Sequence, residues 1–221
     1  MIMQFKKEIF MKKNLILAFV FLITSCRTLS PVFESPEMTG IKSGLLNLPE
    51  TINGFKKTDV LVINEQPYGY ALNYKETTDG FNSVATITMH TPFTEIEGIE
   101  EIKKETFTEG VPEDMFTHTI TIVSLIRVYR NSFEYLGKEP QQITIANIPI
   151  TKSSFKYRLS SGLIGLSTVY TASRQDNYIM NLRITCFVAA GKACEERRDA
   201  FLKKLITNHK CELGLSCLST H

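Results

Sequence analysis

Two residues in the second half of the chain have a spacing that can support nucleophilic chemistry. Ser153 and Lys156 are three residues apart, in the pattern S-x-x-K, at which a lysine can activate a serine. The pattern requires a helix, where residues three apart share a face. Here it lies within the alternating run 151–159, which is typical of a strand, and residues three apart in a strand point to opposite faces. We therefore predict that Ser153 and Lys156 are not catalytic partners.

The histidines belong to no recognisable motif. His90 and His118 each lack an adjacent cysteine, aspartate or second histidine, and we expect His90 in a turn at the end of a strand and His118 on the flank of a helix. The chain contains no G-x-S-x-G, H-E-x-x-H, phosphate-loop or dinucleotide-binding pattern. We expect no catalytic residue, no metal and no cofactor.

The N-terminal segment carries the most specific pattern in the chain. A pair of lysines precedes nine apolar residues, 15–23, which run directly into Ile23, Thr24, Ser25 and Cys26. This arrangement resembles the signal sequence of bacterial lipoproteins, in which a lipobox ends in an acylated cysteine. The apolar run is less than half of the roughly 20 residues that span a bilayer, so we predict no transmembrane helix there. The resemblance implies cleavage before Cys26 and its acylation.

The same resemblance implies a location in the cell envelope. We expect Met11 to be the true start, residues 1–25 to be removed as a signal peptide, and the acyl chains on Cys26 to hold the protein stably in a lipid bilayer. In Gram-negative lipoproteins an aspartate after the cysteine signals retention in the inner membrane, and here that residue is Arg27. The implied location is the outer membrane, with the protein facing the periplasm.

Four cysteines follow Cys26, and an exported protein can use them in disulfides: Cys186, Cys194, Cys211 and Cys217. If 193–209 is helical, Cys194 and Cys211 are about 25 Å apart, which exceeds the Cα separation of about 7 Å that a disulfide allows. We favour Cys186 with Cys194 and Cys211 with Cys217. The alternative is that Cys186 is a buried free thiol. No C-x-x-C spacing supports a zinc site.

Charge excludes one class of partner. Four of the 25 basic residues and one of the 23 acidic residues precede Cys26, so the mature chain has 21 basic and 22 acidic residues. No basic stripe with interleaved aromatic residues remains, and we therefore expect no nucleic-acid partner. A hydrophobic content of 43% and a charged content of 22% are typical of a globular protein.

Hydrophobic periodicity predicts an antiparallel sheet accompanied by helices. The predicted strands are 60–63, 68–74, 81–89, 143–146, 150–159, 164–172 and 178–188, and the predicted helices are 94–110, 111–137 and 193–209. The helix over 111–137 competes with a strand, because 117–123 is rich in β-branched residues. The loops between the last four strands are too short for parallel crossovers, which indicates an antiparallel meander.

The predicted organisation is one domain over 44–209. The Ser, Pro and Gly content of 26–43 predicts a flexible tether, with the alternative that Val32, Phe33 and Met38 pack onto the body, and 210–221 is predicted to be a C-terminal tail. The helix over 193–209 is amphipathic and must cover one face of the sheet; its apolar residues are Phe201, Leu202, Leu205 and Ile206.

This order of elements is similar to the α/β/α sandwich of the PsbP/Mog1/DcrB-like group. Asn147-Ile148-Pro149-Ile150, the meander and the closing C-terminal amphipathic helix carry the similarity. The predicted fold class is therefore α+β, an antiparallel β-sheet with helices packed on it.

The resemblance implies binding rather than catalysis. We expect a non-enzymatic lipoprotein that binds or stabilises an envelope protein or assembly. The alternative is a periplasmic hydrolase or small-ligand-binding protein, with a site near Tyr68, Tyr70, Tyr74 and Arg158.

Overall fold

The computed structural model describes eight segments of the chain: 36–63, 69–78, 81–91, 113–129, 133–136, 140–159, 162–187 and 191–215. All of them belong to one compact unit, Phe33–His221. The lipobox with Cys26, the predicted helix over 94–110, Tyr68 and Cys217 lie outside the described residues.

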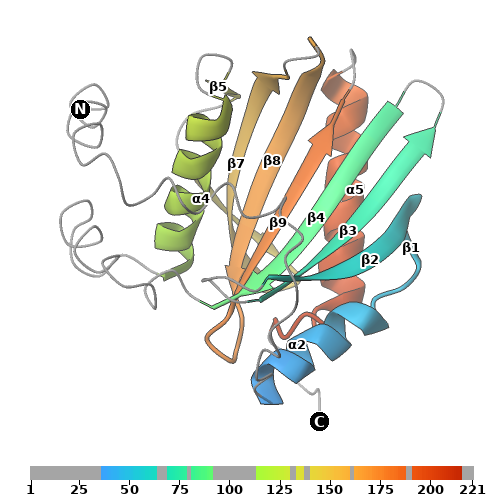
Figure 1. The fold of residues 1–221 in the computed structure, drawn as a ribbon, viewed down its shortest axis with the longest axis vertical. Coiled ribbons are helices and arrows are strands. Elements are labelled where there is room, and N and C mark those ends of the chain that lie inside the picture. Colours follow the sequence, from blue (N-terminus) through green and yellow to red (C-terminus); the bar gives the residue numbers. More distant parts are fainter. Residues whose placement is uncertain are drawn as a thin grey trace, which may run out of the picture. The chain divides into compact units, whose positions relative to one another are not determined.

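In the described part of the chain, nine strands form one antiparallel sheet. The strand order is β1-β2-β3-β4-β9-β8-β7-β5, and β6 also pairs with β7 (Figure 1). The strands are β1 (Thr51–Ile52), β2 (Phe55–Ile63), β3 (Gly69–Thr78), β4 (Phe81–His90), β5 (Glu134–Tyr135), β6 (Gln141–Ile145), β7 (Ile148–Arg158), β8 (Ile164–Ser173) and β9 (Ile179–Cys186). The described helices are α2 (Pro36–Asn47), α4 (Glu113–Tyr129) and α5 (Gly191–His209). The predicted α+β class with an antiparallel sheet is confirmed.

Local turn chemistry accounts for the first hairpin. Asn53 and Gly54 form a two-residue loop between β1 and β2, and both have positive φ, 49° and 88°. Tight hairpins require this conformation, and an Asn-Gly pair adopts it readily. The loop sets the register, in which Ile52 lies opposite Phe55.

The two halves of the sheet join through β4 and β9. These antiparallel strands pair along eight residues, and Ile87 lies opposite Leu182 at the centre. The predicted meander of β6 to β9 is therefore confirmed, but it is continuous with the N-terminal hairpins rather than a separate sheet.

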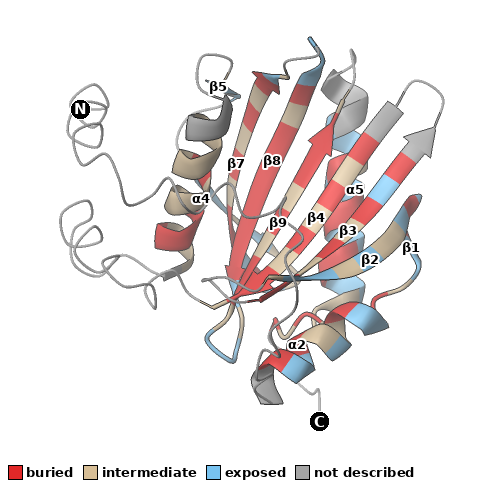
Figure 2. Cartoon of the chain, in the orientation of Figure 1, coloured by how far each residue is buried: buried red, intermediate tan, exposed pale blue. Residues whose placement is uncertain are grey.

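One face of the sheet carries the main hydrophobic core, and α2 and α5 cover it (Figure 2). The Phe201 ring on α5 lies 4.7 Å from the Phe55 ring and 5.6 Å from the Tyr74 ring. Alternate residues of β3, β4 and β9 complete this core, including Leu72, Ile87 and Leu182. The helix predicted over 193–209 is present as α5, and its four predicted apolar residues are buried.

The opposite face of the sheet is covered by α4 along β7, β8 and β9. Ile122 of α4 packs against Phe155, Tyr157 and Val169, which point away from the main core. Figure 1 shows α4 on the near side of the sheet and α5 on the far side. Within 111–137 the helical prediction is correct for Glu113–Tyr129, and the short strand β5 follows it.

Two predicted boundaries are wrong. Helix α2 begins at Pro36, inside the predicted tether over 26–43, and Met38 is 8% exposed within the main core. The alternative that Met38 packs onto the body is correct. At the other end, Leu213 and Leu215 of the predicted tail over 210–221 are also buried in the core. The apolar residues of α2 recur at helical spacing, so this segment folds as a helix although its Ser, Pro and Gly content is typical of a loop.

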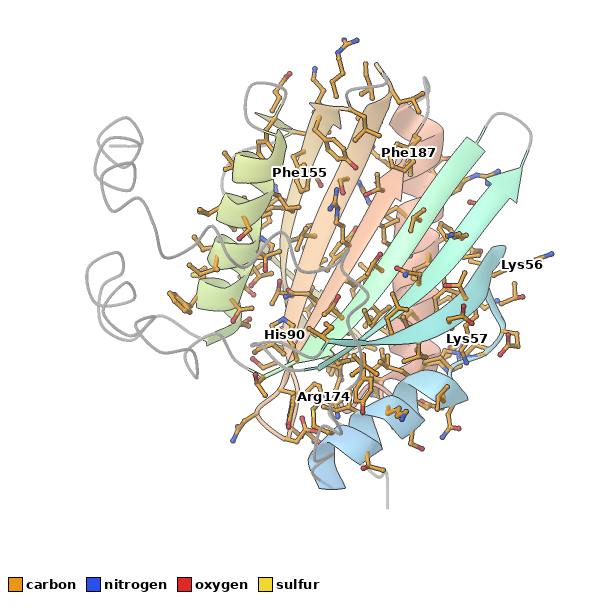
Figure 3. The ribbon with its side chains drawn as sticks, viewed as in Figure 1. Lys56, Lys57, His90, Phe155, Arg174 and Phe187 are labelled. Atoms are coloured by element: carbon orange, nitrogen blue, oxygen red, sulfur yellow. The ribbon has the colours of Figure 1, made fainter. Side chains whose placement is uncertain are left out.

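The C-terminal turn after α5 is attached to the loop between β8 and β9. Arg174, labelled in Figure 3, donates from Nη1 to the Leu213 carbonyl oxygen at 2.6 Å. Its Nε and Nη2 donate to the carboxylate of Asp176 at 2.9 and 2.7 Å. The Gln175 amide also donates to the Gly214 carbonyl at 3.1 Å. These bonds extend the domain beyond residue 209.

Candidate functional site

Polar side chains from five elements, α4 and four strands, meet between α4 and the sheet. His118 of α4 lies at the centre, with Nδ1 2.9 Å from Thr171 Oγ1 of β8 and Nε2 2.8 Å from Ser153 Oγ of β7. His118 is 0% exposed and Ser153 is 6% exposed. The helix is thus connected to two adjacent strands by one imidazole ring.

The same set of bonds continues across the sheet to β4. Thr171 Oγ1 donates to Asn181 Oδ1 of β9 at 2.6 Å, and Asn181 Nδ2 lies 2.8 Å from His90 Nε2. His90 Nδ1 then lies 2.6 Å from the carbonyl oxygen of Thr91. We call Ser153, His118, Thr171, Asn181 and His90 the polar chain.

The carbonyl oxygen at the end of the polar chain determines which nitrogen of His90 carries the proton. A carbonyl oxygen can only accept, so His90 Nδ1 donates to Thr91. In the neutral ring His90 Nε2 then accepts, and it receives its hydrogen bond from the Asn181 amide nitrogen. The Asn181 oxygen therefore faces Thr171, which is the observed arrangement.

The same reasoning assigns the second histidine. Because the Thr171 hydroxyl proton goes to Asn181, Thr171 Oγ1 must accept from His118 Nδ1. His118 Nε2 is then unprotonated and accepts from the Ser153 hydroxyl. Every hydrogen bond of the polar chain therefore runs in one direction, from Ser153 to Thr91.

Burial keeps both rings neutral. Desolvation lowers the pKa of His118 from 6.5 to about 4. Desolvation also lowers the pKa of His90 to about 4, and the hydrogen bond to Thr91 opposes this only in part. At neutral pH both histidines therefore have the uncharged state that the hydrogen-bond directions require.

The arrangement around His118 has the orientation used in nucleophilic catalysis. A serine donates to Nε2 while a second group holds the Nδ1 proton, as in serine–histidine nucleophiles. Ser153 lies beneath α4, however, and its β-strand neighbours and His118 enclose it. In this position its evident effect is to hold α4 against the sheet.

As predicted, the S-x-x-K pattern lies on a strand, and its serine and lysine point to opposite faces. Ser153 points toward α4, whereas Lys156 lies on the other face of β7 and its Nζ is 2.8 Å from the carboxylate of Glu134. The strand places the two side chains on opposite faces of the sheet, so the lysine cannot activate the serine.

Of the predicted alternative ligand site, the structure does not bring together the three described residues, Tyr70, Tyr74 and Arg158. Tyr70 and Tyr74 are buried in the main core, and the Tyr74 hydroxyl donates to the Pro49 carbonyl oxygen at 2.8 Å. Burial raises the pKa of Tyr74 far above its ordinary value. Arg158 is exposed at the end of β7 and lies on the far half of the sheet from β3. These tyrosines are core residues.

Cys186 and Cys211 each form a disulfide, so the alternative that Cys186 is a free thiol is wrong. Cys186 ends β9, whereas Gly214, close after Cys211, bonds to Gln175 at the opposite end of that strand. The length of β9, roughly 25 Å, separates the two places, which exceeds the reach of one disulfide. The two cysteines therefore have different partners, and the pairings with Cys194 and Cys217 stay predictions.

The described segments contain neither a cluster of metal-binding side chains nor a membrane-spanning helix. Among these segments, no group of three or more His, Cys, Asp or Glu side chains is placed to hold a metal ion. None of the helices in the described segments has the length and apolar content needed to cross a membrane.

The sheet edge formed by β2 exposes apolar side chains. Leu61 is 47% exposed and Val62 is 43% exposed. Among the described strands only β1 lies outside β2, and it pairs with Phe55 and Lys56 alone. Figure 3 shows Lys56 at this edge, directed away from the sheet.

Comparison with known proteins leaves the family of this chain open. No family model matches it, and no curated protein matches it. A similar solved structure is that of a protein of unknown function, PA94, from Pseudomonas aeruginosa. It is 8% identical, with a TM-score of 0.43, over 67% of this chain and 96% of that one. A likeness at this level supports no argument about function.

Proposed function

We propose that this chain is a bacterial envelope lipoprotein, held in the membrane by acylated Cys26, whose folded domain binds another envelope protein. The lipobox Ile23-Thr24-Ser25-Cys26 supports the anchor, and Arg27 supports an outer-membrane location facing the periplasm. We also propose that the domain is an α/β/α sandwich of the PsbP/Mog1/DcrB-like type, closed by α5. The placement of α4 on one face of the sheet and α2 and α5 on the other supports this proposal.

The observation that carries the binding proposal is the apolar edge of β2. Leu61 and Val62 expose two large apolar side chains, one on each face of a strand whose outer edge, over 58–63, is unpaired among the described strands. Such an edge offers both backbone hydrogen-bonding groups and apolar contacts, and natural proteins use edges of this kind for recognition. Near Lys57 a register shift in the pairing with β3 limits the flat part of the edge to 60–63.

A crosslinking experiment in intact cells tests the proposal. Wild type is compared with Cys26→Ala, which should be released from the membrane, and with Leu61→Ser. One partner, recovered in stoichiometric amount with wild type and lost with both variants, is the expected result. Leu163→Ser is the matched control, because Leu163 is a similarly exposed leucine at the distant β7–β8 end of the sheet. Equal recovery with Leu61→Ser and wild type contradicts a role for the edge.

The hydrogen bond from Ser153 to His118 favours a second candidate function, a periplasmic serine hydrolase. The serine, the histidine base and the Thr171 hydroxyl on Nδ1 have the required order and distances. A fluorophosphonate probe distinguishes the two candidates, since it labels a serine that a histidine activates and a substrate can reach. The binding proposal predicts that no label is incorporated. Labelling of wild type that Ser153→Ala abolishes would establish the hydrolase instead.

A further inference from the structure

We infer that the polar chain is a two-proton latch: a first proton can be taken up within the chain by reversing hydrogen-bond directions, and a second proton detaches α4 from the sheet. The inference rests on the directions derived above, which couple the links between His118 and His90 to one another. It is independent of the partner-binding proposal.

A proton on His118 requires one local change. Nε2 becomes a donor, so Ser153 must accept from it and turn its own hydroxyl proton elsewhere. The bond from Nδ1 to Thr171 is unaffected. All the links of the polar chain therefore survive this protonation.

A proton on His90 changes the directions of the hydrogen bonds between His90 and Ser153 in the polar chain. His90 Nε2 becomes a donor and faces the Asn181 amide nitrogen, which is also a donor. The Asn181 amide must rotate by half a turn, which directs its nitrogen at Thr171, and the Thr171 hydroxyl proton keeps a partner in the polar chain only if it is donated to His118 Nδ1. His118 responds by moving its proton from Nδ1 to Nε2, where Ser153 accepts it. The protonation state of His90 thus determines the tautomer of His118.

Two protons cannot be accommodated together without leaving a proton unpaired. With both rings charged, His90 requires the reversed amide, while His118 donates from both nitrogens and gives Thr171 no acceptor on either side. Thr171 Oγ1 can accept from both neighbours through its two lone pairs, but its own hydroxyl proton then has no acceptor within the polar chain, in a buried site that also holds two charges. His118 makes the two shortest of the hydrogen bonds that join α4 to the sheet, beside the 3.5 Å contacts of Asp114 with Thr151 and of Thr121 with Asn181, so the second proton acts on the attachment of the helix.

The described charged groups around the two rings do not offset the free-energy cost of adding both protons. On α4 itself, Asp114 lies one turn before His118, and its carboxylate is 3.5 Å from the Thr151 hydroxyl of β7. On β9, Arg183 points to the same face and donates to Tyr157 and Ser167. The other described neighbours of the rings on β4, β7 and β8 are uncharged on this face; Lys152 and Lys156 of β7 point to the opposite face. Among the described residues, one acid and one base therefore face the two rings on this side of the sheet.

Release of α4 would expose a defined apolar surface. Ile122 packs on Phe155, Tyr157 and Val169 beneath the helix, and these side chains lose their cover when α4 leaves. The main core lies on the other side of the sheet and is covered by α2 and α5. The latch therefore predicts a local acid transition of α4 before the domain unfolds.

Nitrogen-15 NMR of the histidine rings tests the latch in the full chain carrying Cys26→Ala. The expected result at pH 7 is a proton on Nδ1 of both His90 and His118. As His90 is protonated, the His118 proton should move to Nε2. Hydrogen-exchange protection of α4 should then fall about tenfold before that of β8 and β9 changes. A proton on Nε2 of His118 at pH 7, or simultaneous loss of protection in helix and sheet, would overturn the inference.

A variant separates the latch from simple burial of two histidines. Thr171→Val keeps the shape of the side chain but removes the central link, so His118 should no longer change tautomer when His90 is protonated. Thr144→Val makes the same change at an exposed position of β6 and should keep the coupling. If Thr171→Val does not fold, the tautomers of wild type still decide the question. Unchanged coupling in a folded Thr171→Val protein contradicts the latch.

Discussion

Two buried histidines should make the stability of this domain depend on pH. Their pKa values are about 4 in the folded chain and 6.5 in the unfolded chain. Between these values the unfolded state binds protons that the folded state does not, so the free energy of unfolding falls as the pH falls from 6.5 to 4. Above 6.5 both states are neutral at these positions, and this contribution is constant. Each ring accounts for at most about 3 kcal/mol.

Urea unfolding at pH 7, 5.5 and 4 measures this dependence. In His118→Gln the side chain no longer titrates but can still donate to and accept from its neighbours on β7 and β8. We expect this variant to lose about half of the pH dependence of wild type. An unaltered slope would show that His118 is not one of the groups responsible.

At the scale of the elements, α4 shows how a segment rich in β-branched residues becomes a helix. Thr119 and Thr121 donate their hydroxyl protons to the carbonyl oxygens of Met115 and Thr117, four residues earlier. Apolar residues on one face pack on β7 and β8 at the same time. Propensity favoured a strand for part of this segment, but tertiary packing decided its conformation.

Helix α5 should contribute much of the stability of the domain. Phe201 is fully buried between Phe55 and Tyr74, so Phe201→Ala should lower the free energy of unfolding by about 3–5 kcal/mol. Lys203 lies on the exposed face of the same helix, and Lys203→Ala should change it by no more than about 0.5 kcal/mol. Urea denaturation of both variants checks this expectation. Similar effects of the two substitutions would mean that α5 is not anchored by its apolar face.

At the scale of the whole molecule, the cysteines should form two separate disulfides. Because Cys186 and Cys211 are both bonded and cannot reach each other, we predict pairs with Cys194 and Cys217 respectively. Peptide mapping by mass spectrometry without reduction should recover the peptides of each pair linked. A linked peptide joining Cys194 to Cys217 would contradict this pattern.

Parts of the fold followed from local patterns. Alternation identified β4 and β7, in which buried residues alternate with less buried ones, whereas β8 and β9 are buried on both faces. Asn53-Gly54 is a strong hairpin signal that could also have placed β1 and the start of β2, but its flanking strands are too short to show alternation. The helical spacing of Met38, Ile41 and Leu45 could likewise have located α2.

By itself the sequence determined the pattern resembling a lipobox that ends at Cys26, the lack of a dense run of basic residues with interleaved aromatic residues, and the strands and helices with clear periodicity, because each of these depends on neighbouring residues. Only the tertiary structure decided the pairing of β4 with β9 and the meeting of His90, His118, Ser153 and Asn181. The hydrogen bond of Ser153 with His118 joins residues 35 positions apart and that of His90 with Asn181 joins residues 91 apart, and the partners are common polar residues that form no local motif. Strand register and the burial of α4 bring them together, and neither can be read from the spacing of residues along the chain.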